Sequence, residues 1–104
     1  MNSKKAIIGR KNGKPHIDVI VVERQHDSVE WSIGEKENTE FKVLFKPKAD
    51  PLKPGRDTST NHILQREIGD GIPRGNNLKY EYKIKLIRTD EDVECKSPPE
   101  MEIQ

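Results

Sequence analysis

The sequence predicts an all-β protein, a single antiparallel β-sandwich domain of about seven strands that spans residues 1–104. Three observations support this prediction. Apolar and polar residues alternate with period two in several segments, as they do in strands that bury one face. Short polar or glycine-containing turns separate these segments at regular spacing. No segment keeps apolar residues at helical spacing over ten positions, and 104 residues is the size of one domain.

The N-terminal part predicts a hairpin. Residues 5–9 (KAIIG) are an expected edge strand, and Asn12-Gly13 after them is the strongest short hairpin signal. Residues 16–22 (HIDVIVV) then predict one strand whose inward residues are Ile17, Val19 and Val21. Apolar residues also occupy the other face of this segment, so we expect it to be covered on both sides.

The middle of the chain contains two clear strands and one ambiguous segment. Residues 29–33 (VEWSI) place Val29, Trp31 and Ile33 on one face, with Trp31 expected between the sheets. Residues 41–45 (FKVLF) place Phe41, Val43 and Phe45 inward in the same way. Residues 62–68 (HILQREI) leave a strand or a helical turn open.

The clearest alternation lies in residues 78–86 (LKYEYKIKL). One face carries Leu78, Tyr80, Tyr82, Ile84 and Leu86, and the other carries Lys79, Glu81, Lys83 and Lys85. Residues 101–104 (MEIQ) are a second expected edge strand. We interpret the lysines as protection of wet faces and strand edges against aggregation, because an RNA-binding sheet would expose aromatic residues among them.

Two connections break the regular spacing of short turns and are the expected binding regions. Residues 46–60 contain three prolines, and residues 69–77 contain three glycines and a proline. Long loops on a rigid frame are often functional, although a crossover between sheets is an equally good interpretation of the first. A protein or peptide partner is expected on the first loop, whose mixed polar set is Lys48, Asp50, Lys53, Arg56 and Asp57.

Composition excludes several classes of function and location. Lys plus Arg number 19 and Asp plus Glu 18, so nothing in the overall charge favours nucleic acid or an anionic membrane. No apolar run has the length of a secretory signal or of a membrane span. One cysteine fits a reducing compartment. We therefore expect a soluble cytoplasmic protein, with its oligomeric state left open.

A copper site is the sharpest chemical hypothesis, because Cys95 and Met101 lie close together in a late loop. Blue copper needs two histidines, a cysteine and an axial methionine, and no histidine lies between Cys95 and Met101. The pairs His16 with Asp18 and His26 with Asp27 match no strong ligand spacing. We expect no metal and no cofactor.

Catalytic and phosphate-binding motifs are also missing from the sequence. There is no G-x-S-x-G, H-E-x-x-H or paired-cysteine motif. The glycine-rich stretch GDGIPRG precedes the clearest strand, whereas a phosphate-binding loop needs a helix N-terminus after it.

As a whole, the order of features resembles the cupredoxin-like and immunoglobulin-like β-sandwiches. The resemblance rests on VEWSIGEKENTEFKVLF, the KPG of the proline-rich connection and YEYKIKL. Asp50-Pro51 and the terminal SPPEMEI also resemble the bacterial DP-EP family, although here the second pair reads Pro99-Glu100. These resemblances imply a sandwich fold and no assigned activity.

The sequence therefore favours a non-catalytic protein- or ligand-binding module that acts through the two long loops or an unpaired sheet edge. Two alternatives stay open. One is a metal-binding or electron-transfer protein that uses Cys95, Met101 and a distant histidine. The other is an enzyme whose site comes together only in three dimensions.

Overall fold

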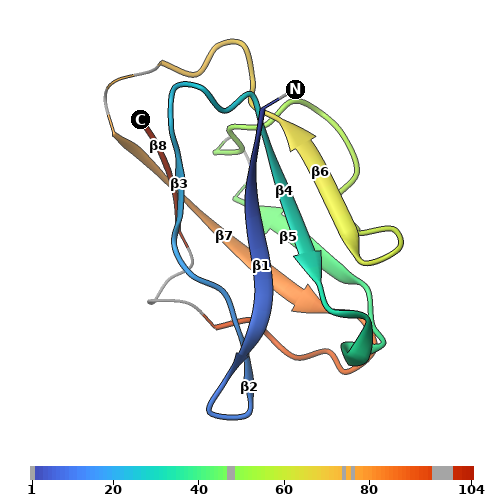
Figure 1. Cartoon of the computed structure of the whole chain (residues 1–104). Coiled ribbons are helices and arrows are strands. Elements are labelled where there is room, and N and C mark those ends of the chain that lie inside the picture. The colour runs from blue at the N-terminus through green and yellow to red at the C-terminus, as the bar shows by residue number, and fades with distance from the viewer. Residues whose placement is uncertain (1, 47–48, 74, 76, 95–99) are drawn as a thin grey trace.

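The computed structural model describes all of the chain except residues 1, 47–48, 74, 76 and 95–99 (Figure 1). Two four-stranded sheets form one globule, whose radius of gyration of 13.1 Å is close to the roughly 13 Å of a 100-residue domain. The all-β prediction is confirmed, but the strands number eight rather than seven. They are β1 (Ser3–Lys11), β2 (Lys14–His16), β3 (Ile20–Val22), β4 (Ser28–Ile33), β5 (Phe41–Phe45), β6 (Ile63–Glu67), β7 (Leu78–Leu86) and β8 (Glu100–Ile103).

The sheets are mixed, which corrects the antiparallel prediction. The first has the order β2-β1-β4-β6 and the second β3-β8-β7-β5. The pairs β1–β4 and β3–β8 are parallel, and the other pairs are antiparallel. The chain leaves the first sheet after β2, forms β3 in the second, and returns to form β4 beside β1. A return through the other layer lets neighbouring strands run the same way.

The same crossing corrects the single strand predicted for residues 16–22. The segment divides into β2 and β3, which belong to different sheets. Ile17 is buried as predicted, but Val19 is exposed and Val21 is half-buried, whereas Ile20 and Val22 enter the core. The spacing of the buried residues changes from two to three because the chain turns from one layer into the other.

Of the two predicted edge strands, the one at residues 101–104 lies inside a sheet, on β8, whereas residues 3–8 of β1 pair with β4 alone and so form a local edge. β1 pairs with β4 along residues 3–8 and with β2 along residues 9–11, and β8 lies between β3 and β7. The connection after β5 covers the edge of that strand, since Val43 N–H donates to the Asp57 carbonyl and Ser59 N–H to the Phe41 carbonyl, both at 2.8 Å. Covered edges leave fewer free backbone groups for pairing with another chain.

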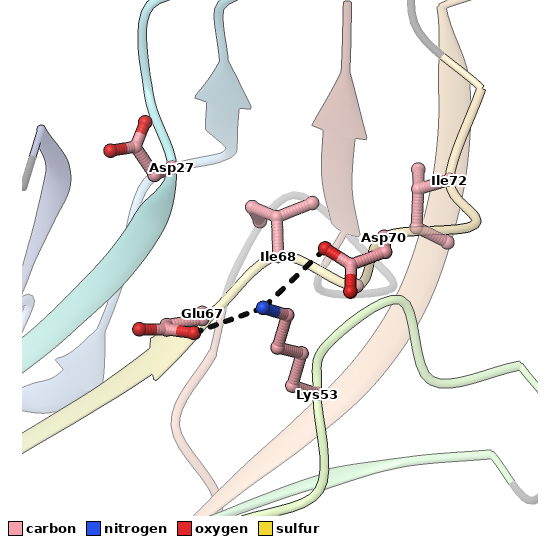
Figure 2. A pocket seen from close by; sticks show the side chains of 7 residues that line it. Asp27, Lys53, Glu67, Ile68, Asp70 and Ile72 are labelled. Atoms are coloured by element: carbon pink, nitrogen blue, oxygen red, sulfur yellow. Dashed lines mark ion pairs between the residues drawn. The ribbon is translucent and has the colours of Figure 1, made fainter.

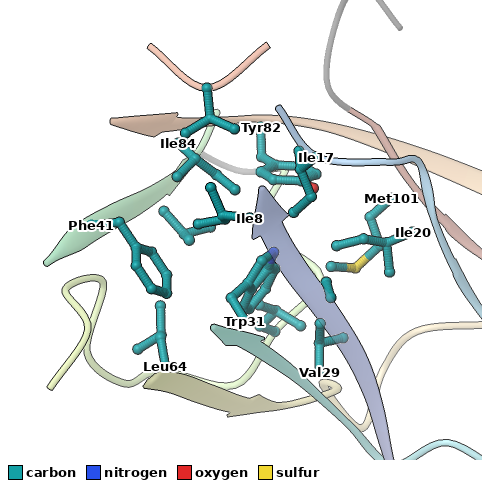
Figure 3. Packing of buried hydrophobic residues seen from close by; sticks show 14 of the residues in the cluster. Ile8, Ile17, Ile20, Val29, Trp31, Phe41, Leu64, Tyr82, Ile84 and Met101 are labelled. Atoms are coloured by element: carbon teal, nitrogen blue, oxygen red, sulfur yellow. The ribbon is translucent and has the colours of Figure 1, made fainter. Parts of the chain in front are cut away.

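The core lies between the two sheets and confirms the predicted inward faces of residues 29–33, 41–45 and 78–86 (Figure 3). Trp31 is fully buried, and its ring meets that of Tyr82 edge-on with centroids 6.1 Å apart. Edge-on contacts of this kind add to the stabilisation that burial provides. Phe45, Leu78 and Tyr80 are half-buried at the margin of the core.

Residues 63–67 of the segment 62–68 form a strand, which decides the alternative that the sequence leaves open. β6 pairs antiparallel with β4, and Trp31 lies opposite Leu64. The Asn12-Gly13 hairpin is confirmed as well, with φ of 53° and 78° at its two central residues. Positive φ at both positions is the pattern of a type I′ turn.

Candidate functional site

The two long connections meet beside the C-terminal end of β6, where they enclose a hollow of about 400 Å³ (Figure 2). We call this hollow the Lys53 cleft. One wall is Lys53 from the first connection, and the other is the segment that leaves β6. The lining residues are Asp27, Lys53, Glu67, Ile68, Gly69, Asp70 and Ile72. The cleft therefore joins the two loops that the sequence marks as binding regions.

Asp50 begins the turn that brings the first connection against β6. Its Oδ1 accepts a hydrogen bond of 2.9 Å from Leu52 N–H, the pattern with which aspartate starts a tight turn. Pro51 and Leu52 are buried as a result. Backbone bonds of 2.8 Å then run from Lys53 N–H to the Glu67 carbonyl and from Gly69 N–H to the Pro51 carbonyl.

Space for a side chain at Gly69 is tight at this junction. A Cβ atom at this position would lie 3.0 Å from the carbonyl oxygen of Pro51. Because that oxygen belongs to the backbone of the facing loop, a residue with a Cβ atom would require a small shift of the loop.

Arg66 on β6 binds the first connection through its guanidinium group. Its side chain is 7% exposed, and its Nη2 lies 3.3 Å from Asp50 Oδ2 and 2.6 Å from the Lys53 carbonyl oxygen. A buried guanidinium must keep such partners, because its charge is costly to remove from water. Nε of Arg66 is buried without a hydrogen-bond partner among the described residues.

Arg66 is not among the functional residues predicted from the sequence. The signal that was present is its position between Leu64 and Ile68 on the inward face of β6. An arginine at an inward position predicts a buried anion or carbonyl group nearby.

Lys53 connects the two walls electrostatically. Its Nζ lies 3.3 Å from Glu67 Oε2 and 3.4 Å from Asp70 Oδ1. The hydrogen bond to Glu67, followed by that to Asp70, raises the pKa of the Lys53 ammonium. Because the group is exposed to water, this pairing orients the side chain more than it stabilises the fold.

The structure separates the five predicted partner-binding residues. Asp50 and Lys53 are engaged in the contacts just described, and Lys53 alone lines the cleft. Arg56 and Asp57 are exposed on the part of the connection that runs back along β5. Lys48 lies outside the described residues. The partner contact on this loop stays a prediction.

The proposed copper ligands can be placed only in part. Met101 is fully buried on β8 among core side chains that include Ile20 (Figure 3), whereas Cys95 lies outside the described residues. His16 Nε2 is 3.4 Å from Asp18 Oδ1, so the predicted meeting of this pair occurs, but Asp18 is 99% exposed. Within the described part of the chain, His, Cys, Asp and Glu form no group of three that would hold a metal ion. The expectation of no copper site stays a prediction.

His26 has a local role in the turn before β4. Its Nδ1 accepts a hydrogen bond of 3.0 Å from Glu23 N–H. Asp27 is one of the residues that line the Lys53 cleft, and its Oδ2 accepts a hydrogen bond of 3.3 Å from Asn2 N–H. His26 and Asp27 therefore make separate contacts, each with a different backbone N–H group.

The lysines predicted on wet faces gather on the outer face of the second sheet. Lys42 on β5 is the cross-strand partner of Lys85 on β7, and Lys83 is exposed beside them. Carboxylates moderate this charge, since Lys85 lies 3.4 Å from Asp90 and Lys46 lies 2.8 Å from Glu81. The tyrosines of β7 face the opposite side, as the sequence predicts.

No protein-family model, curated protein or solved structure matches the chain. The resemblances to cupredoxin-like and immunoglobulin-like sandwiches and to the DP-EP family therefore stay expectations. The longest described helix is the three-residue 3-10 turn η1 (Glu35–Glu37), which is far too short to cross a membrane. Function must be inferred from the site itself.

Proposed function

We propose that this protein is a non-catalytic binding module that holds a segment of a protein or peptide partner in the Lys53 cleft. The observation that supports this function is that the two connections marked as binding regions, residues 46–60 and 69–77, line the same hollow. A strand framework that gathers its long loops at one place is a common arrangement for binding.

The walls of the cleft are ordered before a partner arrives. Backbone hydrogen bonds tie Lys53 to Glu67 and Gly69 to Pro51, and the buried Arg66 fixes the turn between them. A partner that binds to ordered loops loses less affinity to the entropy of immobilisation.

The lining favours a polar segment that carries a cationic side chain. Three carboxylates line the cleft against one ammonium group, and Lys53 already pairs with Glu67 and Asp70. Asp27, which lines the cleft from the turn before β4, has no ion pair among the described residues. Ile72 adds a half-buried apolar contact beside these charges.

The proposed function also includes a fold class and a cellular location. The two sheets constitute a β-sandwich of the immunoglobulin-like or cupredoxin-like kind, and the protein acts in the cytoplasm. In such a sandwich the loops at the end of the layers are free to vary while the frame stays constant.

The experiment that tests this function is site-specific photocrosslinking. A photoreactive amino acid replaces Asp70, whose side chain is 91% exposed at the cleft, and in a control protein it replaces Asp90, which is 83% exposed at the far end of β7. We expect a defined protein or peptide to be captured from Asp70 and not from Asp90.

Competition makes the experiment specific. Excess unlabelled protein should suppress the capture, and excess Asp27→Lys protein should not, because it places a cation where the partner's cation would bind. Equal capture from both positions, or equal competition by the two unlabelled proteins, would show that the cleft is not the binding site.

A further inference from the structure

A second unusual region lies at the opposite end of β6, in the turn that precedes it. Asn61 and His62 have φ of 52° and 68°. Thr60 N–H donates to the Ile63 carbonyl at 2.9 Å, and Ile63 N–H donates back at 3.1 Å, so these two residues form a two-residue hairpin turn.

The second residue of such a turn is ordinarily glycine, because positive φ is unfavourable for residues with a Cβ atom. The same chain follows this rule at Asn12-Gly13, where Gly13 has φ of 78°. Histidine at position 62 therefore keeps an unfavourable backbone conformation that glycine would relieve. Strain of this kind occurs preferentially at functional sites, so the contacts of His62 are informative.

The imidazole of His62 is held in one orientation. Its Nδ1 lies 3.1 Å from the carbonyl oxygen of Thr39, which can only accept, so Nδ1 carries the proton in this contact. Its backbone N–H donates to Glu40 Oε1 at 2.9 Å. Nε2 is left without a hydrogen-bond partner among the described residues.

Glu40 is committed to supporting this turn. The same Oε1 accepts a hydrogen bond of 2.6 Å from the Ser59 hydroxyl, and this bond, with the His62 N–H, lowers the pKa of the Glu40 carboxyl. Ser59 Oγ in turn accepts from Phe41 N–H at 2.9 Å. The network accounts for Glu40 and Ser59 but leaves the outer edge of the imidazole free.

His62 is also one of the residues that line a pocket of about 350 Å³, which we call the His62 pocket. Its lining is formed by residues 38–40, Thr58, His62, Ile87 and Arg88. Ile87 and Arg88 follow β7 and are fixed by their backbones, since Ile87 N–H donates to the Glu40 carbonyl at 2.9 Å and Arg88 N–H to Thr39 Oγ1 at 3.0 Å.

The side chains of this segment are available to a ligand. Arg88 has no ion pair within the described part of the chain, unlike Arg10 and Arg66. Ile87 is 50% exposed, so its side chain can cover an apolar part of a ligand. A metal ion is a poor fit, because Glu40 and His62 offer too few ligands and a guanidinium lies on the same pocket.

We propose that the His62 pocket binds a small organic carboxylate. The Arg88 guanidinium receives the carboxylate, whose shape matches its fork of donors. His62 Nε2 contacts a polar atom of the ligand, and Ile87 covers an apolar part of it. This inference is independent of the proposed partner in the Lys53 cleft.

The test is an NMR titration of the labelled protein with sodium isovalerate, with neutral isovaleramide and inorganic phosphate as comparison probes. We expect saturable shifts at residues 38–40, His62, Ile87 and Arg88 with isovalerate. Isovaleramide should bind at least tenfold more weakly because it lacks the charge, and phosphate should bind more weakly because it lacks the apolar part. Equal binding of either probe would overturn the assignment to an organic carboxylate.

Variants complete the test. Arg88→Gln should weaken isovalerate binding about tenfold, whereas Arg56→Gln, at an exposed arginine away from the pocket, should leave it unchanged. His62→Gly should also weaken binding severalfold while the melting temperature stays equal or rises. If isovalerate gives no saturable shifts, if Arg88→Gln binds like the parent, or if His62→Gly melts earlier, the pocket is not a ligand site.

Discussion

At the C-terminal end of β6, Arg66 and Lys53 each have a carboxylate within 3.4 Å, and the loops around them are tied together by backbone hydrogen bonds. At the N-terminal end, Arg88 has no such partner among the described residues, and His62 keeps a positive φ. Charge at the first end is used to hold two walls in place. Charge at the second end is left available beside an unfavourable backbone conformation. One short strand thus separates a region ordered by ion pairs and hydrogen bonds from a region whose strain and unpaired charge the proposed carboxylate ligand would explain.

The largest expected loss of stability comes from the core beside the middle of β6, and the effects at the two ends of the strand can be compared with it. Trp31 lies opposite Leu64 and is fully buried, so Trp31→Ala should lower the free energy of unfolding by about 3–5 kcal/mol. Urea denaturation measures this loss, with Ser32→Ala on the outer face of β4 as a control that should change little. A native fluorescence spectrum typical of hydrated tryptophan would contradict the burial of Trp31.

The next largest expected loss of stability is specific to the C-terminal end of β6. Asp50→Ala removes the carboxylate from buried Arg66 and should cost about 1–3 kcal/mol of stability, because a buried charge is left with fewer partners. Asp57→Ala on the same connection should stay within about 0.5 kcal/mol, since that side chain is exposed.

Asp50→Asn refines this prediction. Asparagine keeps an oxygen for the Leu52 N–H but loses the charge, so its stability should lie between the parent and Asp50→Ala. If Asp50→Ala and Asp57→Ala cost the same, Arg66 does not depend on Asp50, and the first end is not organised as described.

A smaller effect concerns the two Asn-containing turns. Gly13→His should cost about 1–2 kcal/mol, because a Cβ atom is added where φ is 78° and no other atom lies within 4 Å. His62→Gly should be neutral or stabilise by up to about 1 kcal/mol, since the relief of positive φ outweighs the lost bond to Thr39. Thermal unfolding measures both. A clear destabilisation by His62→Gly would make its ring a structural part of the turn and remove the contrast between the ends.

The smallest effects are opposite responses to pH. The pKa of Glu40 is lowered in the fold, so its contribution is complete above the ordinary carboxyl pKa of about 4.3 and is lost as pH falls through the lowered value. The pKa of Lys53 is raised, so its contribution is complete below the ordinary lysine pKa of about 10.4 and is lost as pH rises through the raised value.

Matched variants resolve these two responses. The difference in melting temperature between the parent and Glu40→Gln should disappear in acid, and that between the parent and Lys53→Met should disappear in alkali. High salt should also reduce the Lys53 difference, because that group is exposed. Differences that stay constant across the pH range would show that neither charge contributes to the fold as described.

The sequence predicts the local features of the fold well because these depend on neighbouring residues. The inward faces of residues 29–33, 41–45 and 78–86 follow from period two, and the first hairpin follows from Asn12-Gly13. The division of residues 16–22 and the parallel pairs do not follow, because they depend on the chain changing sheets. The spacing from Ile17 to Ile20 was the sign of that change, but only the three-dimensional path gives it meaning.

The site was predicted only in outline. The two long connections were identified from their length and composition, and Lys53 does line the cleft where they meet. Arg66, Glu67 and Asp70 were not identified, because their role arises when residues 50–53 fold back against β6. The positive φ of His62 was not predicted either, because two-residue hairpin turns usually contain glycine and an Asn-His pair is not a signal for one.

Amide hydrogen exchange tests most directly whether the walls of the Lys53 cleft are ordered in the free protein. Lys53 and Gly69 N–H donate to backbone carbonyls across the cleft, and Leu52 N–H donates to the Asp50 side chain. We predict that these three amides exchange at rates comparable with those of β5 and β7, and that Asp50→Ala accelerates all three more than it accelerates the strands. Exchange of these amides in the parent protein as fast as in an unfolded peptide would contradict an ordered cleft and, with it, the proposed mode of binding.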